Sequence, residues 1–245
     1  MDLLTVYQER KNEIQKYLDF IAGIETILPD GSPMLTGINT TAHGSVFRIT
    51  PDIQKILYAG LYLQLYNIVE STVVKCVRYI ESSIHQVEYS NWGKLSQNLQ
   101  KEILRSLAKK IADSSIDKRT DAMYFFVQSI FTAGKNIEDN LDLGGGGNWD
   151  DEKIFNFFKR LGINISLQPD IAKNVKIKRY DDMGSLQLVK SFRNKLAHGE
   201  ISFIECGANL SFKELKELTE SVFTYLEEII CQINRFIDER SHIQG

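Results

Sequence analysis

Apolar residues recur every three or four positions along most of the chain, which is the spacing of one face of an α-helix. This spacing predicts a first helix over residues 3–28, which ends at the Pro-Asp-Gly-Ser-Pro run of residues 29–33. A second helix is expected from Pro51 to about residue 87, with Thr50 as its N-cap. Its middle is apolar on nearly every side, so other helices should cover it.

The rest of the chain continues the helical pattern with irregular connections. Residues 162–180 are mixed and basic, and the alternation over residues 175–178 indicates a short strand or an extended loop. The pattern predicts an all-α protein. Further helices are expected over residues 95–112, over 119–138, from Asn148 or Asp150 through Leu161, from Asp181 or Asp182 to His198, and from the capping box of Ser211 and Glu214 to about residue 239.

Two of these helices carry side chains that allow a second interpretation. The helix over 119–138 holds an aromatic cluster at positions 124–131, which we assign to the core, with a base-stacking platform as the alternative. The helix over 95–112 holds Lys101, Arg105, Lys109 and Lys110, and Lys118 and Arg119 follow it. We interpret them as a solvated face, with an RNA contact as the alternative.

Composition narrows the classes of function. The net charge is -3, so the chain is no generic binder of polyanions, and any nucleic-acid contact needs a local basic patch. The three cysteines lie far apart without metal-ligand spacing, as expected in a reducing cytoplasm. No run reaches the roughly 18 apolar residues of a membrane span, and the N-terminus lacks the apolar segment of a signal peptide. We therefore expect a cytoplasmic protein.

The helix that ends at His198 carries the candidate chemistry. At about 100° per residue, its apolar positions form one buried stripe, and Arg193 falls at the edge of that stripe. Lys190, Asn194 and His198 share a polar face, and Asn194 and His198 should be neighbours because they are four apart. A guanidinium can bind phosphate and an imidazole can move a proton near neutral pH. The alternative is a pair of surface residues near a helix end.

Asn67 and Glu70 are polar residues inside the apolar middle of the second helix. They lie three apart and should share a face. A buried carboxylate is costly unless it is paired. Glu70 therefore either lies at the edge of a groove or pairs with Arg193 or a lysine near it.

The stretch from Arg193 to His198 resembles the signature of the HEPN superfamily, in which an arginine precedes a histidine by four to six residues near the end of a late helix. Asn194 matches the polar residue that often follows that arginine. The resemblance is to HEPN-like nucleases of prokaryotic conflict systems. It implies a bundle with a four- or five-helix core over residues 51–245. It leaves residues 1–50, a helical and irregular extension, and the mixed insertion at 140–180 unexplained.

The resemblance also implies a homodimer with a composite active site that cuts RNA without a metal or another cofactor. His198 would be the general acid or base, and Arg193 would hold the scissile phosphate. Asn194 would orient the phosphate or the histidine. Lys190, Lys195 and the basic run at 173–179 would bind the RNA backbone. The chain would act as a toxin or antiphage effector, restrained by an antitoxin or a regulatory protein. The alternative is a catalytically inactive module that binds nucleotide, RNA or a partner protein.

Overall fold

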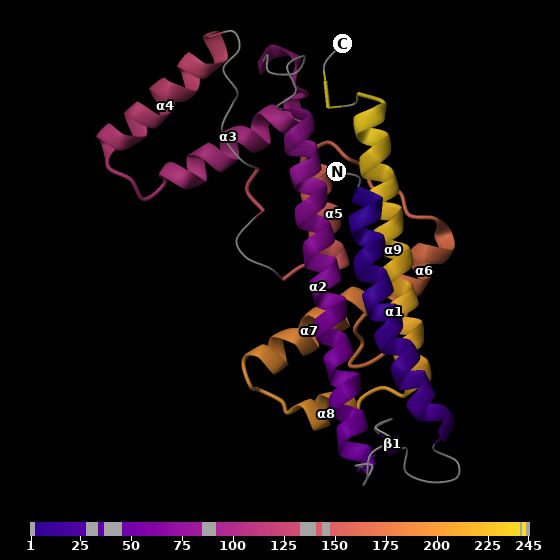
Figure 1. Ribbon diagram of the computed structural model, residues 1–245. Coiled ribbons are helices and arrows are strands. Elements are labelled where there is room, and N and C mark those ends of the chain that lie inside the picture. Colours follow the sequence, from indigo (N-terminus) through magenta and orange to yellow (C-terminus); the bar gives the residue numbers. More distant parts are fainter. Residues whose placement is uncertain are drawn as a thin grey trace, which may run out of the picture. The chain divides into compact units, whose positions relative to one another are not determined.

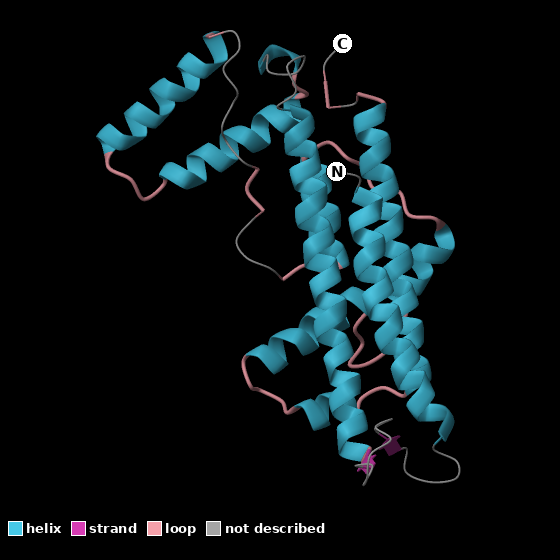
Figure 2. Cartoon of the chain, in the orientation of Figure 1, coloured by secondary structure: helices cyan, strands magenta, loops and turns pink. Residues whose placement is uncertain are grey.

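The computed structural model describes the chain except for residues 1–2, 28–33, 37–45, 85–91, 133–140, 144–147, 241 and 244–245. The described part is almost entirely helical, as the sequence predicted (Figures 1 and 2). Its elements are α1 (Leu3–Ile27), β1 (Met34–Thr36), β2 (Val46–Arg48), α2 (Pro51–Ile84), the 3-10 helix η3 (Trp92–Lys94), α3 (Gln97–Ile111), α4 (Ile116–Phe131), α5 (Asp151–Arg160), α6 (Pro169–Lys176), α7 (Ser185–Ala197), α8 (Phe203–Gly207) and α9 (Phe212–Asp238).

The chain forms two compact units, and the long helices α2 and α9 each contribute to both. The first unit comprises Met1–Glu70 and Gln168–Leu226, and the second comprises Ser71–Leu167 and Glu227–Gly245. The division into an extension over residues 1–50 and a bundle over residues 51–245 remains a prediction from the sequence.

The helix starts follow the capping chemistry of the sequence. Thr50 Oγ accepts the backbone N–H of Ile53 at 3.3 Å, so α2 begins as predicted. Ser211 and Glu214 form the predicted capping box, because each side chain accepts from the other's backbone N–H. The Ser211 hydroxyl and the Ser211 backbone N–H both donate to the Glu214 carboxylate, and these two bonds lower the pKa of that carboxyl. Asp150 caps α5 by accepting the N–H of Lys153 at 2.8 Å.

In the first unit, α1 packs on the first half of α2 and on the first half of α9. The hydroxyl of Tyr7 donates to the backbone oxygen of Phe223 at 3.1 Å, and that of Tyr17 donates to the oxygen of Leu57 at 2.8 Å. The short helix α8 lies directly against α2 at Gly207, where a Cβ would be 1.8 Å from the backbone oxygen of Lys55. Only glycine allows this approach.

The predicted start of the motif-bearing helix was wrong. Asp181 and Asp182 have φ of 48° and 56°, and the N–H of Met183 donates to the oxygen of Tyr180 at 2.9 Å. Two left-handed residues in this position make a type I′ turn, a conformation that aspartate tolerates. α7 therefore begins at Ser185, three to four residues later than expected.

The strand or extended loop expected over residues 175–178 was also wrong in its first half. Val175 and Lys176 are the last residues of α6, a helix that the sequence interpretation missed. Pro169 at its first turn, followed by Asp170, was the available signal.

In the second unit, a buried carboxylate ties α3 to α5. The Glu102 side chain is 1% exposed, accepts from Arg160 Nη2 at 3.0 Å and pairs with Arg105 one turn along its own helix. Two arginines offset the cost of burying this charge. The amide of Gln232 on α9 binds the backbone of Ser166 in both directions, at 2.7 and 2.8 Å.

The aromatic cluster predicted to be core lies on α4, and the prediction was wrong for most of it. Tyr124, Phe125 and Phe131 are exposed, and Phe126 alone among these aromatic residues is buried. Phe126 packs edge-on against Trp92 with ring centroids 5.2 Å apart. The helical period of this segment was right, but one face of it remains uncovered by the described residues.

Candidate functional site

The inner side of α7 forms the stripe that the sequence predicted. Leu186, Val189 and Phe192 are buried. The ring of Phe192 lies between the rings of Tyr62 on α2 and Tyr180, with centroids 4.8 and 5.4 Å away. This packing fixes the rotation of α7 about its axis, and with it the direction of the motif side chains.

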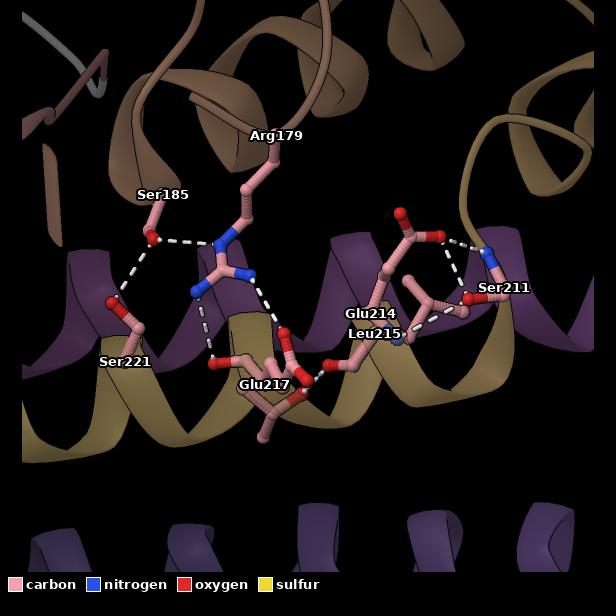
Figure 3. A network of polar contacts seen from close by, with 8 residues as sticks. Arg179, Ser185, Ser211, Glu214, Leu215, Glu217 and Ser221 are labelled. Carbon is pink, nitrogen blue, oxygen red and sulfur yellow. Dashed lines mark hydrogen bonds and ion pairs between the residues drawn. The ribbon is translucent and has the colours of Figure 1, made fainter. Parts of the chain in front are cut away.

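The start of α7 is fastened by a buried arginine (Figure 3). The Arg179 side chain is 7% exposed and lies 3.6 Å from the Glu217 carboxylate through Nη1. Its Nε donates to Ser185 Oγ at 3.2 Å, and that hydroxyl is 2.9 Å from the hydroxyl of Ser221 on α9. Arg179 therefore holds α7 to α9. This corrects its placement in the RNA-binding basic run.

The end of α7 is a Schellman motif centred on His198. Gly199 takes φ of 69°, its N–H donates to Leu196 O at 3.2 Å, and the N–H of Glu200 donates to Lys195 O at 2.9 Å. His198 is the C-cap and is exposed, as is Gly199. The predicted end of the helix at Gly199 is confirmed, and it places His198 on the surface of the first unit.

The guanidinium of Arg193 is held in two ways. Its carbon lies 4.4 Å from the centroid of the Tyr66 ring, and Nη1 donates to Asn194 Oδ1 at 2.9 Å. Tyr66 is 2% exposed, so its ring is a fixed surface of α2. The guanidinium lies over this ring and uses Nη1 for Asn194, so its other N–H donors can bind an anion.

Asn194 was expected to orient the phosphate or the histidine, and in the structure its side chain accepts a hydrogen bond from Arg193. The link between Asn194 and His198 is a backbone bond, from the His198 N–H to Asn194 O at 2.9 Å. In the described part of the chain, the imidazole has no hydrogen bond or ion pair. The structure thus joins Arg193 and Asn194 and leaves the histidine ring turned to solvent.

Lys190 and Lys195 lie on the same helix as the motif and are partly exposed. Lys195 Nζ is 5.8 Å above the Phe192 ring. Both lysines therefore sit on the helix that presents Arg193, as the sequence interpretation required.

The two polar residues of α2 do not join the motif. Asn67 is exposed and lines a groove of about 60 Å³ with Arg10, Glu13 and neighbouring residues of α1 and α2. Within the described residues, Glu70 forms no ion pair with Arg193 or with a lysine. The cause is the helical turn of about 100° per residue: Tyr66 faces α7, and Asn67 points away from it.

Sequence reasoning missed Tyr66. The available signal was a pair of tyrosines, Tyr62 and Tyr66, spaced four apart in the apolar middle of α2. Both rings reach α7, one against Phe192 and one against Arg193. Neither contact follows from the sequence alone, because the register of α7 on α2 decides it.

No group of three or more His, Cys, Asp or Glu side chains within the described residues is arranged to hold a metal ion. None of the helices in that part of the chain has the length and apolar character needed to cross a bilayer.

A comparison with protein families gives one result that covers nearly the whole chain. The model of the HEPN_MAE_28990-like HEPN family matches residues 2–241, which include the N-terminal helix, the mixed insertion and the Arg193–His198 stretch. No curated protein and no solved structure matches the chain. The family match extends over the two segments that the motif resemblance had left unexplained. The chain belongs to this HEPN family.

Proposed function

We propose that the chain is a metal-independent endoribonuclease that cuts RNA by attack of the 2′-OH on the adjacent phosphorus. The observation that carries the proposal is the arrangement at the end of α7. An arginine is held by an aromatic ring and an amide, and an exposed histidine follows at the helix terminus. Membership of a HEPN family supports the same class of function.

Arg193 supplies the phosphate site. Its guanidinium is oriented by Tyr66 and Asn194, and the remaining donors can bind two phosphate oxygens in a fork. Negative charge builds on those oxygens as the 2′-oxygen attacks, so a donor already in place stabilises the transition state. Lys190 and Lys195 on the same helix would bind neighbouring phosphates.

His198 supplies the proton transfer. One imidazole takes the proton from the 2′-OH, the P–O5′ bond breaks, and a proton passes to the departing 5′-oxygen. The products are a 2′,3′-cyclic phosphate and a 5′-OH end. DNA lacks the 2′-OH and resists this reaction.

A homodimer would complete the site. A single motif offers one imidazole, whereas two motifs across a two-fold axis offer two imidazoles and two guanidinium groups. Such an enzyme would act as a toxin or antiphage effector, and an antitoxin or regulatory protein would restrain it. The activity as a toxin or antiphage effector and its restraint by a second protein are both part of the proposal.

The test is cleavage of labelled RNA by purified protein in EDTA, beside His198→Ala and the matched control Gln187→Ala. Gln187 is exposed on the same helix and lies outside the motif. We expect the wild type and Gln187→Ala to cut, His198→Ala to lose at least about 100-fold in rate, and the products to carry cyclic phosphate. Equal cutting by His198→Ala, or products with 3′-OH ends, would refute the mechanism.

One observation favours a second candidate, a catalytically inactive HEPN module that binds nucleotide, RNA or a partner protein. The imidazole of His198 has no hydrogen bond within the described residues to fix its orientation, whereas a general base is usually held by a second group. The same experiment separates the two candidates. Binding of labelled RNA without cleavage by any preparation, monomeric or dimeric, would favour the inactive module.

A further inference from the structure

Helix α4 carries an apolar stripe that no described residue covers. At about 100° per residue, six positions fall within a sector of about 100°. Five of them are large apolar side chains with exposed fractions from 46% to 83%. The sixth is Thr120, whose hydroxyl donates to its own helix at Ile116 O (2.9 Å) and so leaves the methyl group outward. The stripe consists of Ile116, Thr120, Met123, Tyr124, Val127 and Phe131.

The stripe is not the side by which α4 is attached to its own unit. Phe126 makes that attachment, edge-on against Trp92, and it lies about 110° around the helix from the middle of the stripe. Figure 1 shows α3 and α4 as a helical hairpin. A contiguous exposed stripe of this size marks an interaction surface.

The order of residues in the stripe is symmetric about its midpoint, between Met123 and Tyr124. Ile116 and Phe131 are equally far from that point, and so are Thr120 and Val127. Two α4 helices laid antiparallel would place the large end residues against each other and the two β-branched residues against each other. We propose that the α4 stripe binds the α4 stripe of a second copy of this chain, antiparallel, about a two-fold axis at its midpoint.

The distribution of charge selects this pairing. The charged residues of α4 are Asp117, Lys118, Arg119 and Asp121, and residues 122–131 have none. Antiparallel pairing lays the charged half of one helix on the uncharged half of the other. Parallel pairing would set each charge beside its own copy, which is unfavourable. The helix dipoles also oppose each other only in the antiparallel arrangement.

The area is of the size that such an interface needs. The 16 residues of α4 span about 24 Å. The exposed parts of the five large side chains amount to roughly 600 Å², since large side chains offer about 150–250 Å² each. A stable interface covers about 800 Å² per partner, so the stripe and its immediate flanks suffice. This pairing involves residues outside the Arg193–His198 motif and does not rest on the ribonuclease proposal.

The first test is particle mass by light scattering for Val127→Asp beside Phe125→Asp. Val127 lies on the midline of the stripe, and Phe125 lies on the opposite side of the same helix at 68% exposure. Both variants add the same charge to α4. We expect Val127→Asp to halve the mass of the assembly and to weaken association about 100-fold. The reason is that the new carboxylate would be buried between two apolar stripes. Phe125→Asp keeps the wild-type mass.

The second test reads the register by disulfide cross-linking. Cys231 is exposed, so the background is Cys231→Ser. Thr120→Cys and Val127→Cys chains are oxidised separately and as a mixture. In the proposed register position 120 faces position 127 of the second copy, whereas two copies of position 120 are about 10 Å apart along the helix, too far for a disulfide. We expect cross-links in the mixture alone.

Other outcomes overturn the proposal. Cross-linking of Thr120→Cys by itself would indicate parallel pairing. An unchanged mass for Val127→Asp, with no cross-link in any sample, would mean that the stripe serves a different partner. A folded Val127→Asp, checked by circular dichroism, keeps the mass measurement valid.

Discussion

Replacing Tyr66 by leucine tests whether the orientation of Arg193 matters for chemistry. The ring lies 4.4 Å from the guanidinium carbon and is 2% exposed, so it is a rigid platform for a partly exposed cation. Leucine keeps a buried apolar side chain at this position and removes the π face. Asn194 then becomes the one described group that still holds the guanidinium.

Two magnitudes follow from these contacts. A cation–π contact with a partly desolvated arginine is worth about 1 kcal/mol, which corresponds to about a fivefold fall in kcat/KM if the held orientation is the reactive one. The large-to-small change in the core costs a further ~2–3 kcal/mol of folding free energy. Tyr66→Phe keeps the ring and should stay within about twofold of the wild-type kcat/KM.

The assay combines RNA cleavage with urea unfolding, so that activity is expressed per folded molecule. Tyr62→Leu is the matched control. Tyr62 lies one turn earlier on α2, is fully buried and contacts Phe192, whereas the ring against Arg193 is that of Tyr66. Both leucine variants should lower the free energy of unfolding. Tyr66→Leu alone should lower kcat/KM.

Two results would contradict this account. Equal kcat/KM for Tyr66→Leu and Tyr66→Phe would mean that the ring does not orient the arginine during the reaction. An equal loss in Tyr62→Leu and Tyr66→Leu would mean that loosened packing of α7, and not the guanidinium contact, lowers the rate.

Two further predictions concern stability. Gly199→Ala should lower the melting temperature by about 2–4 °C in thermal unfolding: a Cβ meets no atom within 4 Å, so the cost is the left-handed backbone alone, about 1 kcal/mol. Burial lowers the pKa of His242, which is 1% exposed, so its contribution to stability is complete above about pH 6.5 and is lost as the pH falls toward the lowered value. The melting temperature should fall from pH 7.5 to 5.5, and by less in His242→Phe; an equal fall would exclude this residue.

The long helices could be predicted because several signals agree along them. α2 and α9 combine an unbroken apolar period with a cap at the first turn, and their starts at Pro51 and Phe212 follow the caps at Thr50 and Ser211. The start of α7 could not be predicted by the same rules. Aspartate favours both helix N-termini and left-handed turns, and Asp181 and Asp182 adopt the turn.

Burial of polar and aromatic side chains depended on contacts that are remote in the sequence. Arg179 follows a run of lysines, yet it bonds to Ser185 and pairs with Glu217, and its side chain is 7% exposed. The aromatic residues of α4 have the composition of a core, and periodicity locates their stripe without showing what covers it. The sequence therefore located the arginine and the aromatic residues, but contacts between distant segments decide whether each is buried or exposed.

The candidate site shows the same limit at the level of single contacts. The sequence predicted that Arg193, Asn194 and His198 share the end of one helix, and the described structure places them there. The sequence did not predict that Asn194 would bind the arginine, because a helical wheel gives each residue one direction and ignores the rotation of its side chain. The guanidinium contacts both the Tyr66 ring on α2 and the amide of Asn194.

The motif is fastened at both ends, which bears on the need for a second chain. Arg179 ties the start of α7 to α9, and the Schellman motif fixes its end, so Arg193 and His198 are carried on a rigid element. One fixed helix therefore carries one guanidinium that can bind phosphate and one imidazole. A single imidazole cannot accept the 2′-OH proton and donate to the 5′-oxygen in the same instant. In the proposed mechanism the missing acid or base therefore comes from another group, and a second copy of α7 would supply one on the same helix framework.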